Sequence, residues 1–186
     1  MLESMGSVDS TGASGPADGS DDGQPALARD GTEFDLNGRP VAPRRWNALR
    51  RAVGGRRGAR RERLTTADRD VVVVAESDDE AASSSSILDD STLRTEDQAV
   101  VRHVLALPGH AVDAAAALAA LDGYEVLPAD VVGDRFDFPS GYDRLVLARV
   151  QLVDALHVSQ ERSRMASLAS RHSGVPVGWQ IVQRKR

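Results

Sequence analysis

The sequence predicts an α+β fold, in which a β-α-β-β-α-β succession follows a long N-terminal region without a core of its own. Between residues 99 and 183, apolar side chains recur at the two periods that distinguish helices from strands, and the segments alternate in that order. Five aromatic side chains lie after residue 120, so the means of filling a core are concentrated late in the chain. The 186 residues are therefore expected to form one small domain with long tails.

The domain begins with a strand and a helix. Residues 100–107 form an apolar run of strand length, which a proline-glycine pair ends. An alanine-rich helix is expected over residues 111–121, with Leu118 and Leu121 on one side, and its small side chains let it lie close to a sheet. Residues 124–127 follow as a short strand.

The third strand is predicted over residues 145–153 and is the longest expected. Its alternation places four apolar side chains, beginning with Val146, on one face and Arg149 and Gln151 on the other. The loop before it, residues 128–141, carries several aspartates in a glycine- and proline-containing setting where acidic residues are ordinary.

The final helix, expected over residues 158–172, leads directly into the final strand. Met165 lies on the apolar stripe of this helix, and a serine-glycine pair supplies the stop. The period then changes to two, which places Val177, Trp179 and Ile181 on a single strand face.

This succession is that of the ferredoxin-like fold, a four-stranded antiparallel sheet with two helices on one face. Right-handed crossovers place the first and third strands in the centre and the second and fourth at the edges. Residues 101–107 and 146–152 are accordingly expected to be adjacent and antiparallel.

The domain is predicted to span residues 99–183, with a basic tail at residues 184–186. Residues 1–98 are predicted to be a disordered, low-complexity region, because their composition supplies too little apolar surface to offset the entropy of ordering the chain. The valine run at residues 71–74 has strand propensity. Two interpretations stay open for this run: docking as an extra edge strand, or no docking at all.

Composition and motifs argue against several classes of function. Cysteine is absent, which excludes disulfides, thiolate metal sites and a cysteine nucleophile. No segment approaches the roughly 20 apolar residues of a membrane helix, and a cytoplasmic protein without membrane association is expected. The histidines lack metal-ligand spacing and the serines lack a nucleophile elbow. We therefore expect no enzymatic activity, no catalytic residue, no metal and no cofactor.

One feature suggests a binding function, an arginine-rich segment over residues 39–63. It lies between two acidic stretches, so the formal net charge of −5 is the sum of blocks of opposite charge. Guanidinium groups bind phosphates bidentately and an aromatic ring stacks on bases, so the segment is a candidate contact for nucleic acid or an acidic partner. The residues concerned are Arg44, Arg45, Trp46, Arg50, Arg51, Arg56, Arg57, Arg60 and Arg61. The alternative is that the segment neutralises the acidic stretches of its own chain.

Two short motifs connect the C-terminal domain to a known family. Asp-Gly-Tyr-Glu-Val follows the first helix, and a glycine-tryptophan pair stands in the last strand, with the long third strand and the last helix between them. With these features, roughly residues 99–183 resemble the RraB family, the regulators of ribonuclease E activity. The motif positions are Gly123, Tyr124, Gly178 and Trp179, to which we assign structural roles.

The resemblance implies a small α+β protein that binds the non-catalytic part of ribonuclease E, or a related component, and lowers RNA cleavage without being an enzyme. We therefore expect a non-enzymatic regulator that binds a protein partner, a ribonuclease E-like enzyme, and whose arginine-rich segment adds electrostatic affinity. Two alternatives stay open. One is an RNA-binding protein that uses this segment, with an affinity that falls about tenfold or more between low and physiological salt. The other is a small-molecule-binding regulatory α+β domain, which requires a pocket.

Overall fold

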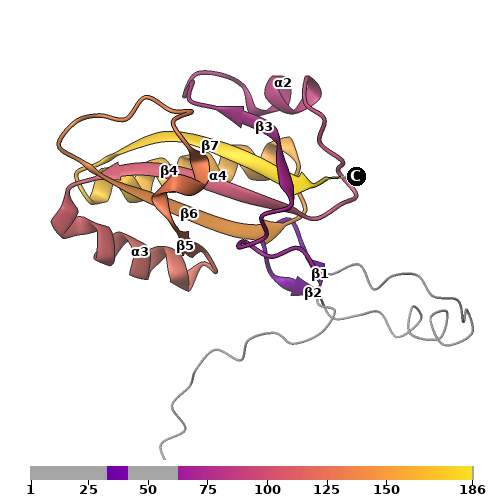
Figure 1. Ribbon diagram of the computed structural model, residues 1–186, viewed down its shortest axis with the longest axis horizontal. Helices are drawn as coiled ribbons and strands as arrows, with labels where there is room; N and C mark the ends of the chain where they lie inside the picture. The colour runs from indigo at the N-terminus through magenta and orange to yellow at the C-terminus, as the bar shows by residue number, and fades with distance from the viewer. Residues whose placement is uncertain (1–32, 42–62, 186) are drawn as a thin grey trace, which may run out of the picture.

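The computed structural model describes residues 33–41 and 63–185 (Figure 1). Five strands form one antiparallel sheet in the order β3-β7-β4-β6-β5. Their bounds are Val71–Ser77 for β3, Ala99–Leu107 for β4, Glu125–Leu127 for β5, Asp143–Gln151 for β6 and Val175–Arg184 for β7. A separate hairpin of β1, Glu33–Phe34, and β2, Pro40–Val41, contacts β6.

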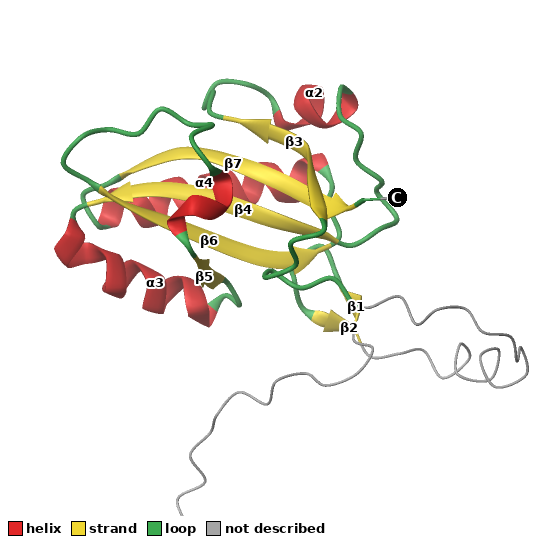
Figure 2. Cartoon of the chain, in the orientation of Figure 1, coloured by secondary structure: helices red, strands yellow, loops and turns green. Residues whose placement is uncertain are grey.

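Two helices cover one face of the sheet, and a short third helix lies near β3 (Figure 2). The helices are α2, Ser84–Asp89, α3, Val112–Leu121, and α4, Ala155–Arg171, with 3-10 turns η1 at Gly109–Ala111 and η2 at Ala129–Val132. Ala115 of α3 and Met165 of α4 belong to one buried cluster with Leu105 of β4 and Leu147 of β6. This cluster is the main core between helices and sheet.

The predicted centre of the sheet is confirmed. β4 and β6 are antiparallel neighbours in a continuous register that runs from Ala99 opposite Gln151 to Leu107 opposite Asp143. Every residue of β4 is buried, because the strand has neighbours on both sides and covered faces above and below. β5 lies at the sheet edge, as expected for the second strand of the succession.

The sheet is not the four-stranded one predicted, because a fifth strand pairs with β7. β3 aligns antiparallel to β7, from Val71 opposite Arg184 to Ser77 opposite Trp179, and β7 is therefore not an edge strand. Of the two interpretations for the valine run at residues 71–74, docking as an extra edge strand is confirmed. The predicted disorder of residues 1–98 is wrong for the described parts of this region, residues 33–41 and 63–98, which contribute the β1–β2 hairpin, β3 and α2. Its composition resembles a linker, but the open edge of β7 offers backbone partners that only the folded sheet creates.

The second face of the sheet is also covered. Val104 of β4, Val146 of β6 and Val182 of β7 form a cluster there with Phe136 from the loop between β5 and β6 and with Leu64 from the segment before β3. α3 and α4 therefore cover one face, and loops with the 3-10 turn η2 cover the other (Figure 1). This second layer explains why the central strands are apolar on both faces rather than alternating.

The side of α3 that faces the sheet consists of alanines and not of its leucines. Leu118 and Leu121 are 46% and 83% exposed, whereas Ala115 and Ala119 are buried against the sheet. The helix approaches the strands through its smallest side chains, because close approach of a helix leaves no room for leucine at the contact. The alanines permit this approach, as expected, and the leucines face away from the sheet.

β7 also departs from simple alternation. Trp179 and Ile181 lie on the helix-covered face, as predicted, but Val177 packs against the cluster on the opposite face. The pairing of β7 with β4 shifts register between Val104 and Leu105. This irregularity changes the face of the sheet to which the β7 side chains on its N-terminal side point. With ten residues, β7 is also longer than β6, which has nine, so the prediction of the longest strand is wrong.

A tight turn joins α4 to β7. Ser173 adopts a left-handed φ of 58°, and the Gly174 N–H donates to the Ala169 carbonyl at 2.9 Å, so the helix stops at the predicted pair. Gly174 lies directly against β4. A Cβ at this position would overlap the carbonyl oxygen of Ala106 and the side chain of Leu107.

We expect Gly174→Ala to destabilise the fold by about 2 to 3 kcal/mol, because the overlapping atom belongs to the backbone of a central strand. Gly141→Ala is the matched control: Gly141 has a φ of 82°, but nothing lies within 4 Å of the place that a Cβ would take, so only about 1 kcal/mol of backbone strain is expected. Denaturant unfolding measures both losses. Equal losses in the two variants would contradict the overlap.

Candidate ligand-binding cleft

A row of polar and aromatic side chains crosses three strands on the helix-covered side of the sheet. Ser77 of β3 lies opposite Trp179 of β7, and Trp179 lies opposite His103 of β4. These three residues line a cleft of about 560 Å³. This volume lies within the range of small-molecule sites, about 300 to 1,000 Å³.

α4 and the segment that joins β3 to α2 form the walls of this cleft. Ser159, Arg162 and Ala166 line it from α4, whereas residues 78–80 line it from the segment. Apolar side chains, among them Leu105, contribute as well. The cleft therefore combines an apolar part with polar and charged walls, which is the usual make-up of a binding site for a small organic molecule.

Arg162 holds the two walls together. Its guanidinium donates hydrogen bonds to oxygen atoms of the segment between β3 and α2 and of α2 itself, so the position of this segment depends on α4. The acceptors are the carbonyl oxygens of Ala82 at 2.7 Å, Glu80 at 2.9 Å and Asp79 at 3.0 Å, and Oγ of Ser84 at 3.1 Å.

Trp179 is 3% exposed, yet its indole Nε1 has no hydrogen-bond acceptor among the described residues. Leaving a buried donor unpaired costs about 1 to 3 kcal/mol. The guanidinium of Arg162 lies over the ring at 5.8 Å from its centroid, which helps to orient the indole. An acceptor on a molecule bound in the cleft would complete the hydrogen bonding of Trp179.

A buried ionic network lies behind His103. Oε1 of Glu161 on α4 accepts from Arg149 at 2.6 Å and from Gln151 at 2.7 Å, and Arg149 also donates to Gln151 at 2.9 Å. Oε2 of Glu161 faces Nε2 of His103 at 3.3 Å. Because these four residues are each at most 5% exposed, the network is isolated from solvent, and it ties α4 to both central strands.

The network shifts the pKa of two of the groups around it. Burial alone would raise the pKa of Glu161, but the hydrogen bond from His103, the charges of His103 and Arg149 and the hydrogen bond from Gln151 outweigh it and lower the pKa to about 2. Burial and the nearby Glu161 carboxylate raise the pKa of Tyr124 well above its ordinary value. Glu161 is therefore ionised and Tyr124 neutral at physiological pH.

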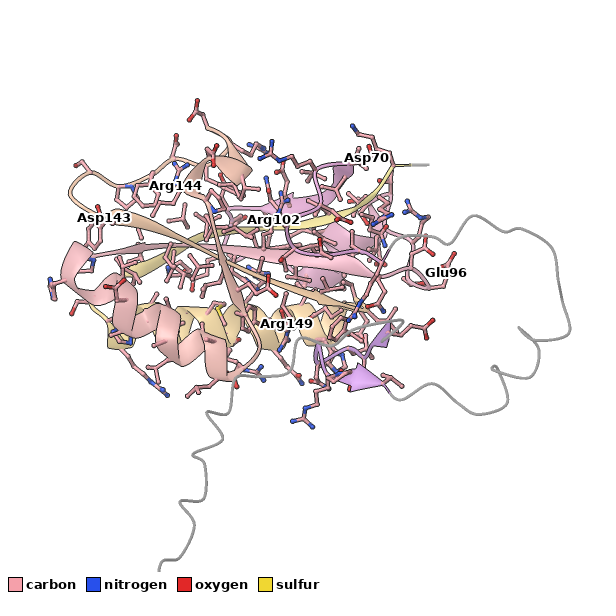
Figure 3. The ribbon with its side chains drawn as sticks, turned by 60° about the horizontal axis from the view of Figure 1, so that its bottom comes forward. Asp70, Glu96, Arg102, Asp143, Arg144 and Arg149 are labelled. Atoms are coloured by element: carbon pink, nitrogen blue, oxygen red, sulfur yellow. The ribbon has the colours of Figure 1, made fainter. Side chains whose placement is uncertain are left out.

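The two buried arginines of the sheet have different surroundings (Figure 3). Arg149 points to the helix side, where it pairs with Glu161 and lies 4.5 Å from the centroid of the Tyr124 ring. Arg102 points to the opposite side, and burial lowers its pKa. Among the described residues Arg102 has no carboxylate partner, and the structure gives it a single carbonyl acceptor, Val131, at 3.4 Å.

The structure places the four family-motif positions within or beside this face. Gly123 follows α3 with a φ of 80°, and Tyr124 is buried against Arg149. A Cβ at Gly178 would lie 2.6 Å from the ring of Phe136, so this glycine permits a close approach of chain from the other face. Tyr124 and Trp179 each have a buried polar atom without a hydrogen-bond partner among the described residues, and of these two residues Trp179 lines the cleft.

The other predicted site residues lie outside the described residues. These are the arginine-rich positions between Arg44 and Arg61 together with Trp46, on which the nucleic-acid interpretation depends. That interpretation stays a prediction.

Sequence reasoning misses the residues that carry the cleft. It assigns Arg149 to the polar face of its strand, and nothing local indicates that this face is buried. One signal is present: Glu161 stands one turn before Met165 on the apolar stripe of the last helix, where a carboxylate is unusual. His103 and Arg162 have no local signal, because their partners are remote in the sequence.

The described parts of the chain show neither a metal-ligand cluster nor a membrane span. In residues 33–41 and 63–185 there is no group of three or more histidine, cysteine, aspartate or glutamate residues placed to hold a metal ion. Within the same ranges no helix has the length and apolar character needed to cross a bilayer.

Comparison of the chain with protein-family models, with curated proteins and with solved structures gives no match. The resemblance to the RraB family therefore stays a prediction from short motifs.

The low pKa of Glu161 makes stability depend on pH. Its folded-state pKa of about 2 lies below the ordinary 4.5, so its contribution, about 3 kcal/mol, is present above about pH 4.5 and is lost as the pH falls toward 2. Glu161→Gln should lower stability at neutral pH and flatten this acid slope. Denaturant unfolding at a series of pH values measures the free energy of unfolding and its slope with pH, and Glu96→Gln, at an exposed position, is the control. A Glu161→Gln variant with the slope of the parent would contradict the assignment.

Proposed function

We propose that the chain is a non-enzymatic regulatory protein that binds a small molecule in the cleft between β7, α4 and the segment joining β3 to α2. In this proposal β4 to β7, with α3 and α4, form a ferredoxin-like unit, and β3 and α2 are additions that complete the cleft. One observation carries the proposal: the indole N–H of Trp179 is buried without an acceptor among the described residues, beside a cleft of about 560 Å³.

The chemistry of the cleft favours binding over catalysis. His103 is the lining residue best suited to act as a base, and its Nε2 faces the carboxylate of Glu161. Among the described residues no serine hydroxyl forms a hydrogen bond with either of these two side chains. A nucleophile aligned with a base, which covalent catalysis requires, is therefore not assembled in this arrangement.

In this proposal, a ligand in the cleft acts on the protein surface through the segment between β3 and α2. A ligand between the two walls contacts both α4 and the segment that Arg162 holds through carbonyl oxygens. In this proposal, ligand binding stabilises the observed position of this segment and of α2 by as much as the ligand prefers this arrangement over others. The segment and α2 carry Asp78, Glu80 and Asp89, so the surface that responds is acidic.

This acidic surface supports a protein partner for the regulated step. A basic partner suits it electrostatically, and the partner predicted from the family resemblance, a ribonuclease E-like enzyme with a basic RNA-binding region, is our candidate. The arginine-rich segment would add contacts to RNA or to acidic parts of the same assembly.

A thermal-shift screen of the full chain with amines, amino acids, carboxylic acids and neutral metabolites tests the ligand. At 100 times its Kd, a compound that binds only the folded state stabilises it by about 2.7 kcal/mol. Ser159→Phe fills the cleft from α4 and should abolish the shift, while Ser167→Phe, which lies outside the cleft on the same helix, should leave it unchanged. A screen without any stabilising compound, or shifts that survive Ser159→Phe, would contradict the proposal.

Affinity purification of the full chain from a bacterial lysate tests the partner. We expect a ribonuclease or an RNA-associated protein to be retained, and we expect its recovery to change when a compound that stabilises the parent is added. The Ser159→Phe variant serves as the control, since its recovery should not respond to the compound. Retention of no such protein would exclude this partner and leave the ligand-binding result unaffected.

A further inference from the structure

The cleft has an acidic wall. Asp78, Asp79 and Glu80 are consecutive and all three line it. None of their carboxylates forms an ion pair with another described residue. Asp79 uses one oxygen to accept the backbone N–H of Ala81 at 2.8 Å, which shapes the segment and leaves its charge uncompensated.

Arg162 is the arginine among the cleft-lining residues and carries the charge opposite to that of the three acidic residues. Its N–H groups donate to three carbonyl oxygens and one hydroxyl, so in the structure it forms no hydrogen bond with a carboxylate of the described residues. The lining therefore holds three acidic residues and one arginine whose donors are already used. Outside the lining, Arg135, which pairs with Glu76, also interacts electrostatically with Asp78. With three carboxylates and one guanidinium, the charged lining residues sum to a formal charge of −2, which favours a cation over an anion.

Two further groups restrict the ligand. The Trp179 Nε1–H needs an acceptor, which a simple ammonium ion does not have. Leu156, which is 64% exposed and lines the cleft, offers apolar contact, whereas Leu105 and Met165 lie beneath the cleft surface. A ligand that satisfies all of these groups has a positive charge, a hydrogen-bond acceptor and an apolar body.

We infer that the cleft binds a small organic amine in its cationic form, with a carbonyl or hydroxyl acceptor and an apolar body. This inference rests on the proposed ligand-binding function and specifies its ligand. The ammonium group lies at the wall formed by Asp78 and Glu80, and the acceptor receives the indole N–H of Trp179. The apolar body packs against Leu156.

A matched series of probes with one body and different charges tests the inference. Phenylalaninamide is the cation, phenylpropanamide is the neutral molecule and phenylpropanoate is the anion. The full chain with Trp46→Phe keeps Trp179 as its sole tryptophan, so quenching of the indole emission reports binding at the cleft. We expect the cation to bind about tenfold more tightly than the neutral amide, and the anion more weakly than both.

Charge variants locate the preference. Asp78→Asn with Glu80→Gln should reduce the cation preference to about threefold or less, whereas Asp89→Asn with Asp90→Asn, which removes the same charge at the end of α2 outside the cleft lining, should leave it near tenfold. Raising the salt concentration should weaken the cation more than the neutral amide.

Several outcomes would overturn the inference. These are equal affinity for the cation and the neutral amide, an unchanged preference in the Asp78 and Glu80 variant, or no quenching by any of the three probes. The proposed function is judged separately: a neutral or anionic compound that stabilises the parent and fails with Ser159→Phe would uphold the cleft as a binding site and refute the cationic ligand.

Discussion

The arrangement of the folded part depends on one buried carboxylate. Glu161 reaches from α4 into the interface with the sheet, where Arg149 and Gln151 of β6 donate to it and His103 of β4 faces it. A buried charge is tolerated only when it is paired and hydrogen-bonded. Sliding or rotating α4 by one residue would separate Glu161 from these partners, so the network sets the position of the helix on the sheet more strictly than apolar packing does.

The cleft follows from that position. Successive residues of a helix point about 100° apart, so with Glu161 directed to the centre of the sheet, Arg162 is directed toward β3. There it captures the carbonyl oxygens of the segment that leads into α2. Glu161 thus fixes α4 to the sheet, and Arg162 fixes the segment between β3 and α2 to α4. The space left between them lies over His103 and Trp179.

The irregular layer on the opposite face has a complementary role. Phe136 and Leu64 cover the side of the sheet that the helices leave free, and Gly178 allows the Phe136 ring to approach β7. With both faces covered, the central strands form the floor of the cleft, and α4 and the segment between β3 and α2 form its walls.

The sequence by itself determined the secondary structure succession from β4 to β7, the adjacency of β4 and β6 and the stop at the end of α4, because periodicity, glycine and the handedness of crossovers are local or general constraints. Only the tertiary structure decided that β3 joins the sheet, that Val177 turns to the other face and that α3 packs through its alanines. It alone also brought His103, Arg149 and Glu161 together, since their positions are separated by up to 58 residues in the chain. Such pairings depend on which strand edges and faces are left free once the core has closed, and no window of neighbouring residues contains that information.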